Sequence, residues 1–191
     1  MLSRKSFLTG TGALGGLLLF SRPSLSMPEA APHLAPFMAR PALGNSYWYI
    51  GHLLSILIKA TDTNNLFSLL KMTEVKGLEP PPHTHTREDE IFMVLDGSIE
   101  FSVGGKTYQA TAGDSMFLPR NIQHAFKVLT DRAEVMILLT PGGFEQYFVE
   151  MSEPAPAMEL PPPPAGAPDI ARLIATSSRY GIRFPERPSG M

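Results

Sequence analysis

Short segments rich in apolar, aromatic and β-branched residues recur through the middle of the chain, with turn-forming residues between them. Each is too short for an ordinary helix and long enough for a β-strand. The turns include Asp96-Gly97, Gly104-Gly105 and Ala112-Gly113. Many short strands joined in this way predict an all-β sandwich or barrel. The predicted strands are residues 47–50, 53–59, 66–76, 90–95, 98–103, 107–110, 115–118, 124–128 and 134–140.

The strand predicted at 90–95 opens with Glu90 and continues as an unbroken apolar run from Ile91 to Leu95. Such a run predicts a strand that is buried on both faces. Other apolar side chains near it are expected to point into the barrel. The full inward set is Phe92, Val94, Phe101, Met116, Phe126 and Met136. A cavity lined in this way would suit a flat, aromatic or enolisable small molecule.

Two histidines and a carboxylate stand directly before that run. His83 and His85 are one residue apart, so their side chains project to the same side of an extended chain. Glu90 can share that side only if the chain turns between, and the polar segment 86–89 permits a turn. A further histidine, His124, opens a later predicted strand. Neutral imidazoles are the usual nitrogen ligands of divalent transition metals, so these residues are candidate metal ligands.

Two stretches of the sequence resemble the paired motifs of the cupin superfamily. The first motif is matched at Gly77, His83, His85, Glu90 and Gly97. The second motif is matched at Gly113, Pro119 and His124. It departs at Asn121, where the family usually has glycine, and at Val128, where asparagine is usual. Asparagine tolerates the left-handed backbone that a tight turn requires, and Val128 is not a ligand position.

The resemblance covers roughly residues 46–150 and implies a double-stranded β-helix, the jelly-roll barrel. It also implies one divalent metal site. The implied ligands are His83, His85, Glu90 and His124. Such a donor set does not choose between iron, manganese, nickel, cobalt, copper and zinc. The alternative is a barrel that has lost its metal and keeps its histidines for packing.

Several neighbouring residues compete with this assignment. Glu88 and Asp89 are carboxylates beside Glu90, but both are expected on a solvated turn because only Glu90 directly precedes the buried run. His52 has no partner in either motif and is expected to be structural. Tyr49 is expected to pack in the barrel wall. The metal assignment therefore stays with the residues that have the motif spacing.

The sequence around the motifs resembles the quercetin-dioxygenase-like branch of the cupins, in particular Pro80 to Glu90 and Pro141 to Glu145. This resemblance implies a metal-dependent oxidoreductase of the dioxygenase type, acting on a flavonol-like or enediol small molecule. It further implies that Glu90 is catalytic and accepts the substrate hydroxyl proton. The alternative is a periplasmic metal-bearing cupin that binds or isomerises a small molecule without oxygen chemistry, because one barrel hosts many functions.

Residues 1–26 have the pattern of an export signal, with basic residues, a short apolar run and small residues at the end. The Arg4-Lys5 pair resembles a twin-arginine signal whose second arginine is replaced by lysine. The general secretory route and a retained anchor are the alternatives. Because the apolar run is short for a bilayer, we expect a periplasmic or secreted protein without a stable membrane span after cleavage.

The composition excludes some classes of protein. The chain has no cysteine, so neither a disulfide framework nor a lipid-modified cysteine is available. Its formal net charge is −2, and no basic cluster supports binding to the phosphates of nucleic acid. The predicted partner is therefore a small-molecule substrate, and stability is expected to come from core packing and the metal.

Domain boundaries follow from composition. A linker rich in Pro and Ala is predicted at 27–44, the cupin barrel at 45–150 and a Pro-rich extension at 151–191. A helical turn from Phe144 to Met151 is expected to plug one end of the barrel. In the extension, a short C-terminal helix is predicted at 169–180 with Ile170, Leu173 and Ile174 as its apolar face, followed by an edge strand at 182–184. This extension could pack on its own barrel or swap onto a neighbour in a homodimer.

Overall fold

The computed structural model describes residues 34–163, 166 and 169–185. The predicted export signal at 1–26 lies outside these residues, as does the first part of the predicted linker. From residue 34 to residue 42 the chain has no regular secondary structure and is almost wholly exposed. The first element is a short 3-10 helix, η1 (Leu43–Asn45). A second 3-10 helix, η2 (Ala60–Thr63), joins the second and third strands.

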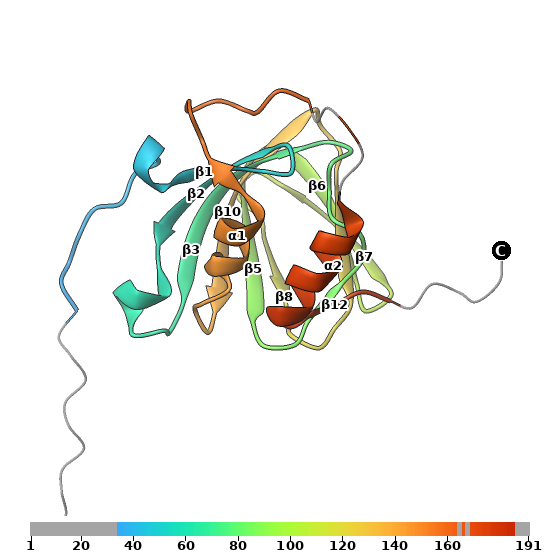
Figure 1. The fold of residues 1–191 in the computed structure, drawn as a ribbon. Coiled ribbons are helices and arrows are strands. Elements are labelled where there is room, and N and C mark those ends of the chain that lie inside the picture. Colours follow the sequence, from blue (N-terminus) through green and yellow to red (C-terminus); the bar gives the residue numbers. More distant parts are fainter. Residues whose placement is uncertain (1–33, 164–165, 167–168, 186–191) are drawn as a thin grey trace, which may run out of the picture. The chain divides into compact units, whose positions relative to one another are not determined.

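The strands form a seven-stranded sheet, a three-stranded sheet and a two-stranded sheet, all antiparallel. The two larger sheets enclose a common interior (Figure 1). In spatial order, the seven-stranded sheet consists of β11 (Glu153–Pro154), β1 (Ser46–Tyr49), β2 (His52–Ile58), β3 (Ser68–Val75), β10 (Arg132–Thr140), β5 (Asp89–Asp96) and β8 (Ser115–Leu118). The three-stranded sheet consists of β7 (Lys106–Thr111), β6 (Ser98–Val103) and β9 (His124–Val128). The two-stranded sheet pairs β12 (Ile182–Arg183) with β4 (Thr84–His85).

Every strand predicted from the sequence is present, with small shifts at the ends. The predicted all-β jelly-roll fold is thus confirmed. The predicted strand at 98–103 has the observed bounds of β6, and the predicted strand at 124–128 has those of β9. These segments alternate apolar residues with turn residues, which is the pattern that an antiparallel sheet with one buried face requires.

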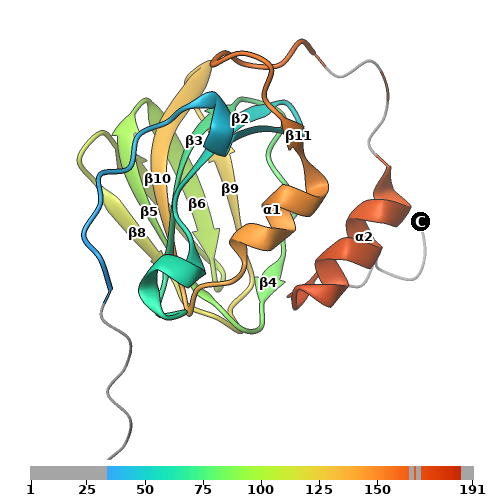
Figure 2. The same cartoon turned by 60° about the vertical axis from the view of Figure 1, so that its left-hand side comes forward.

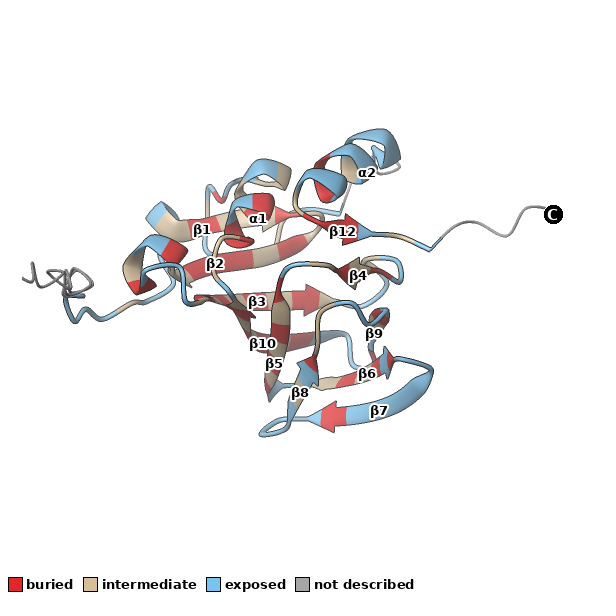
Figure 3. Ribbon diagram, turned by 90° about the horizontal axis from the view of Figure 1, so that it is seen from below, coloured by how far each residue is buried: buried red, intermediate tan, exposed pale blue. Residues whose placement is uncertain are grey.

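The core forms where the inner faces of the sheets meet, and two predictions about it are wrong. In β10, Val135, Ile137 and Leu139 are buried, so Met136 points to the outer face and not into the barrel. In β5 only alternate residues are buried, and Leu95 is 48% exposed. Figure 3 shows this alternation along the strands. Both errors have one cause: an apolar run does not reveal which alternate residues face the core.

Helix α1 (Glu145–Met151) follows the barrel and covers one end of it (Figure 2). Phe144 before the helix, and Tyr147 and Phe148 within it, are all buried in the core. This confirms the predicted plug. Glu145 is buried as well, and its side chain accepts hydrogen bonds from the backbone N–H groups of Ala60 (2.9 Å) and Gly143 (2.8 Å). The carboxylate of Glu145 therefore connects the plug to η2, the 3-10 helix between β2 and β3.

Helix α2 (Ile170–Arg179) and strand β12 lie against the barrel of the same chain, beside α1. The side chain of Asp169 accepts a hydrogen bond from the backbone N–H of Arg172 and caps the helix. The predicted apolar face is wrong in part. Ile170 and Ile174 are each 48% exposed, while Thr176 and Ser177 are buried. The predicted edge strand at 182–184 is confirmed as β12, paired with β4.

Among the residues that the structure describes, none of the helices is long and apolar enough to cross a membrane.

Candidate metal centre

Backbone hydrogen bonds bring the three motif histidines together. His83 and His124 face each other across an antiparallel bridge, in which each backbone N–H donates to the carbonyl oxygen of the other at 2.9 Å. The backbone N–H of Asn121 donates to the carbonyl oxygen of His85 at 2.7 Å. Asn121 has a φ of +64°, the left-handed conformation expected for the position where the family usually has glycine. The turn before β9 therefore holds His85 through Asn121, and the start of β9 holds His83 through His124.

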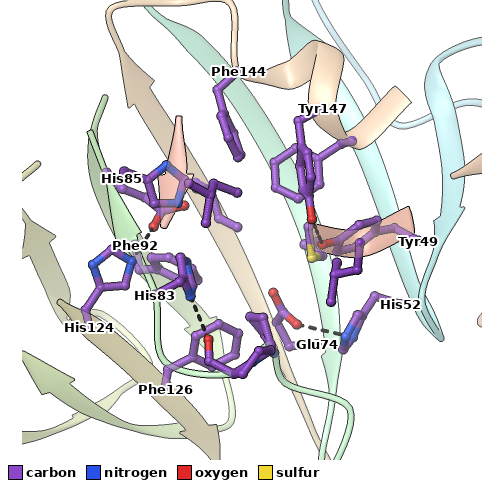
Figure 4. Close-up of a pocket in the computed structure, with 18 of the residues that line it drawn as sticks. Tyr49, His52, Glu74, His83, His85, Phe92, His124, Phe126, Phe144 and Tyr147 are labelled. Atoms are coloured by element: carbon purple, nitrogen blue, oxygen red, sulfur yellow. Dashed lines mark hydrogen bonds and ion pairs between the residues drawn. The ribbon is translucent and has the colours of Figure 1, made fainter. Parts of the chain in front are cut away.

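The three imidazoles converge on one point (Figure 4). His83, His85 and His124 each offer a ligand atom, and these atoms all lie within 4.8 Å of one another. His83 and His124 each hold their Nδ1 against the carbonyl oxygen two residues earlier, at 2.9 Å and 3.2 Å. A ring whose Nδ1–H donates to a carbonyl presents the bare Nε2 as a lone-pair donor. The backbone therefore orients two of the three rings for metal binding.

Two buried nitrogen atoms of this cluster have no hydrogen-bond partner, namely Nε2 of His124 and Nδ1 of His85. Burial lowers the pKa of His83 and His85 to about 4 and that of His124 to about 3, and the neighbouring imidazoles lower it further for His83 and His124. All three rings are therefore neutral near pH 7, which is the form that binds metals. Three neutral, convergent imidazoles with unpaired buried nitrogens fit a divalent transition metal.

Glu90 lies at the same point. Its side chain is buried, and Oε2 is 3.5 Å from Nε2 of His124. Burial raises the pKa of Glu90 to about 8, with further increases from the nearby carboxyl groups of Glu74 and Glu88. A divalent cation among the imidazoles would favour the charged carboxylate instead. The structure brings Glu90 to the three histidines, and its role as the fourth ligand stays a prediction.

The expectation that Glu88 lies on a solvated turn is wrong. Its side chain is buried, and Oε2 lies 3.7 Å from Nδ1 of His85, with no hydrogen-bond partner for either atom. The next residue, Asp89, is half-buried and binds the Arg120 guanidinium with two hydrogen bonds of 3.0 Å and 2.8 Å. The local sequence does not predict the burial of Glu88.

A pocket opens from the histidine cluster into the barrel. Its apolar lining includes Phe92 and Phe126, which were predicted to point inward. The C-terminal segment contributes Leu173 of α2, Ile182 of β12 and Phe184, which follows β12. The other predicted inward residues, Val94, Phe101 and Met116, belong to the core or pack against it. The polar residues that line the pocket are Tyr49, His52, Glu74, His83, His85, Glu90, His124 and Tyr147.

His52 differs from the motif histidines. Its Nε2 bonds the carbonyl oxygen of Leu78 at 3.1 Å, and its Nδ1 accepts from the backbone N–H of Val75 at 3.1 Å. The prediction that His52 is structural is confirmed. Tyr49 packs on the plug as expected, edge-on to Phe148, but it also faces the pocket.

Glu74 lines the pocket, although its position there was not predicted from the sequence. Glu74 is 3% exposed and occupies an inward position of β3, where the preceding inward residues are Leu70 and Met72. An acid that continues an apolar alternation is the signal that could have found it. Tyr147 and the β12 residues carry no comparable local signal.

Residues 70–141 match the family model of the cupin domain. The chain is 24% identical over 127 residues to quercetin 2,3-dioxygenase of Bacillus subtilis (strain 168), covering 66% of this chain and 38% of that protein. It is 26% identical over 133 residues to quercetin 2,3-dioxygenase of Aspergillus japonicus, covering 65% of this chain and 38% of that protein. The chain thus spans well under half the length of these curated relatives.

Among solved structures, an RmlC-like cupin from Shewanella frigidimarina NCIMB 400 is 20% identical, with a TM-score of 0.49. That similarity covers 60% of this chain and 99% of the other. The family match takes in β3 to β10, which include the predicted ligands and most of both large sheets. Residues 70–141 of the chain therefore resemble a cupin domain.

Proposed function

We propose that the protein is a metal-dependent cupin oxidoreductase that uses dioxygen to cleave a small enediol. One observation carries the proposal: three neutral, buried imidazoles and the Glu90 carboxyl group meet at one wall of an otherwise largely apolar pocket. The two quercetin 2,3-dioxygenases with similar sequences support oxygen chemistry by analogy.

The residues of the chain have distinct roles in this proposal. His83, His85 and His124 would hold one divalent ion, and Glu90 would complete the site. When bound, the ion would supply Lewis acidity that lowers the pKa of a substrate hydroxyl. Glu90 accepts the proton of that hydroxyl, because its carboxyl oxygen lies beside His124 in a region that excludes water. The aromatic walls hold the substrate in an apolar environment.

The size of the pocket favours the enediol over a flavonol. The cavity volume, counted as the space open to the centres of water-sized groups, is about 60 Å³. One water molecule needs roughly 10–15 Å³ of such volume, so the cavity has room for about four to six water-sized groups. A flavonol has three rings and exceeds this space, whereas a substrate of a few carbon atoms fits. Leu173, Ile182 and Phe184 line the pocket from the C-terminal segment, so larger molecules would have to displace α2 and β12.

A second function, isomerisation without oxygen, is favoured by a separate observation. Two buried carboxyl groups, Glu74 and Glu90, both line the pocket, and burial raises the pKa of each to about 8. A pair of carboxyl groups that can exchange protons near neutral pH is suited to moving a proton between two carbon atoms of a hydroxy ketone.

Dioxygen consumption separates the two functions. Cleavage of the double bond of an enediol by one molecule of dioxygen leaves a carboxyl group on each carbon, so both oxygen atoms enter the product. We expect the metal-loaded protein to consume one dioxygen per molecule of reductate, a small enediol, and to act much more slowly on quercetin. Labelled dioxygen should appear in the product acids. Metal-free protein and Glu90→Gln should be inactive, while Glu134→Gln, on the outer face of β10, should remain active.

If the protein isomerises the substrate without consuming dioxygen, it is an isomerase and the dioxygenase proposal is wrong. Absence of both reactions in protein shown to hold its metal would contradict both functions. The outer-face variant matters here because it changes a carboxylate without touching the pocket.

We also propose that the protein is exported and that cleavage follows near Ser26. The proposal is based on the basic start and short apolar run of residues 1–26. Replacing Arg4 and Lys5 together with Gln should leave precursor in the cytoplasm. Mass spectrometry should then find the shortened chain only for the wild type. Uncleaved wild-type protein in the cytoplasm would contradict export.

A further inference from the structure

Glu74 is the second carboxyl group of the pocket, and the proposed dioxygenase reaction gives it no role. It lies on β3, on the wall opposite the motif histidines (Figure 4). Its side chain is almost completely buried and continues an apolar alternation. Burying a carboxyl group is costly unless hydrogen bonds compensate. The hydrogen-bonding partners of Glu74 therefore decide whether it is only structural.

Oε2 of Glu74 lies beside His52, and both ring nitrogens of His52 already have hydrogen-bond partners. Oε2 lies 3.2 Å from Nδ1 of His52. This nitrogen accepts from the backbone N–H of Val75, and Nε2 of the same ring bonds Leu78. A neutral imidazole has one donor and one acceptor nitrogen, and both are in use. Oε2 of Glu74 accordingly has no hydrogen-bond partner.

The protonation state of Glu74 also affects which hydrogen bonds it can make. Burial raises the pKa of Glu74 to about 8, with a further increase from Glu79, so the carboxyl group is neutral near pH 7. A protonated carboxyl group can both donate and accept a hydrogen bond. The carboxyl group therefore lines the pocket with unused hydrogen-bonding capacity.

We propose that Glu74 binds the end of the substrate that lies away from the histidines, through a hydroxyl or carbonyl oxygen. The substrate class is then a compact molecule of a few carbons with an oxygen anion at one end and a neutral oxygen group at the other. Apolar residues, including Phe92, Phe126 and Ile137, line the pocket with these two walls and would contact the carbon atoms between the ends. This inference rests on the proposed metal site and specifies the substrate of that site.

Matched pairs of carboxylates test the inference on the metal-loaded protein, with cobalt as the ion. Each pair differs by a hydroxyl in place of a methyl group: glycolate and propionate, 3-hydroxypropionate and butyrate, 4-hydroxybutyrate and pentanoate. Calorimetry gives both dissociation constants of each pair, and azide serves as a probe of the metal alone. We expect the hydroxyl member of at least one pair to bind about tenfold more tightly to the wild type, the size of one good hydrogen bond to a buried group.

Three variants attribute the preference to Glu74. In Glu74→Met, which keeps a similar shape without polar atoms, the ratio should fall to about one and azide should bind as in the wild type. Glu134→Met makes the same substitution on the outer face of β10 and should keep the ratio. Glu74→Leu also removes the polar atoms and is the second variant in case Glu74→Met does not fold. It should likewise bring the ratio close to one.

The outcomes separate this inference from the proposed function. If the wild type binds azide but prefers the hydroxyl member of none of the pairs, the role of Glu74 is overturned. An unchanged ratio in a folded Glu74 variant overturns it as well. If the wild type fails to hold cobalt or to bind azide, the proposed metal site itself is wrong, and the inference falls with it.

Discussion

Two kinds of histidine line the same pocket, and their hydrogen bonds separate them. His52 uses both ring nitrogens on backbone groups, at 3.1 Å each. The motif histidines do not: His124 has a buried Nε2 and His85 a buried Nδ1 without any hydrogen-bond partner. Leaving a buried polar atom unpaired costs about 1–3 kcal/mol, so binding of an ion to Nε2 of His124 would be favoured. The chemical difference between His52 and the motif histidines therefore lies in their hydrogen-bond partners and not in the residue type.

The difference between His52 and the motif histidines shows which properties identify a ligand-binding histidine. Burial and a lowered pKa occur on both walls, since burial lowers the pKa of His52 as well as that of His83. Only the motif wall combines these properties with convergence of three rings and with unpaired nitrogens. We therefore expect substitutions on the two walls to affect different quantities, metal affinity on one and folding stability on the other.

The largest expected effect is on metal content. Replacing His83, His85 or His124 singly with Ala should lower metal affinity by more than about 100-fold, which exceeds the ~10–100-fold typical of residues outside the ligand set. His52→Ala should keep one ion per chain and lower the free energy of unfolding by about 1–3 kcal/mol, because buried backbone groups lose a partner. Elemental analysis and chemical denaturation measure the two effects. Full metal occupancy in both His85→Ala and His124→Ala would contradict the assignment.

The next effect concerns the adjacent carboxyl groups. Glu90→Gln should impair turnover most, because Glu90 is both the predicted ligand and the proton acceptor. Glu88→Gln should lower metal affinity about tenfold, because a buried carboxylate 3.7 Å from His85 would attract a bound cation. Asp89→Asn only breaks a half-exposed pair with Arg120 and should change metal affinity by less than about fivefold. Equal effects of all three on turnover and metal affinity would show that only the net charge near the site matters.

The third prediction concerns pH and the metal-free protein. The motif histidines have pKa values lowered from 6.5 to about 4, 4 and 3, so between roughly pH 6.5 and 4 the unfolded chain binds more protons and acidification lowers stability. Glu74 and Glu90 have pKa values raised from 4.5 to about 8. Between those values the folded protein binds more protons, and stability is lost as the pH rises.

The two effects oppose each other below pH 6.5, and the carboxyl groups dominate above it. We expect the free energy of unfolding of the metal-free protein to fall between pH 6.5 and pH 8. In metal-loaded protein the fall should be smaller, because the cation stabilises the charged form of Glu90. Urea denaturation at several pH values measures this. A metal-free protein that gains stability from pH 6.5 to pH 8 would show that the two carboxyl groups are not buried as described.

The smallest effect is expected at the plug. The hydroxyl group of Tyr147 lies 3.3 Å from that of Tyr49 and 3.4 Å from Oγ of Ser177, which are long hydrogen bonds. Tyr147→Phe should therefore lower the free energy of unfolding by about 0.5–1.5 kcal/mol and leave metal content unchanged. Loss of the metal in this variant would mean that the plug helps to hold the histidine cluster. Thermal denaturation with elemental analysis distinguishes the two results.

Much of the fold was predictable because antiparallel strands leave a local pattern. The segment 98–103, for example, is bounded by two turn signals, Asp96-Gly97 and Gly104-Gly105, and becomes β6. The convergence of His83, His85 and His124 followed from motif spacing, and the position of Asn121 from its tolerance of a positive φ. These features are determined by residues that lie close together in the sequence.

The errors involve contacts between distant parts of the chain. Strand β4, shortly before the buried Glu88, pairs with β12 from nearly 100 residues away in sequence. The buried side of α2 is its Thr176 and Ser177 surface, which faces α1, and its isoleucines are left exposed. Glu74 is different, because its inward position continues the local alternation of Leu70 and Met72 along β3. Local periodicity does not specify which face a partner will cover.

Elemental analysis of protein purified without added metal is the decisive measurement for the proposed metal centre. We expect one divalent transition metal ion per folded chain in the wild type, the same content in His52→Ala, and less than about a tenth of it in His124→Ala. A wild-type protein that binds no such ion, even after equilibration with iron, manganese, nickel, cobalt, copper and zinc in turn, would show that the histidine cluster is not a metal site. So would equal metal content in the His52 and His124 variants.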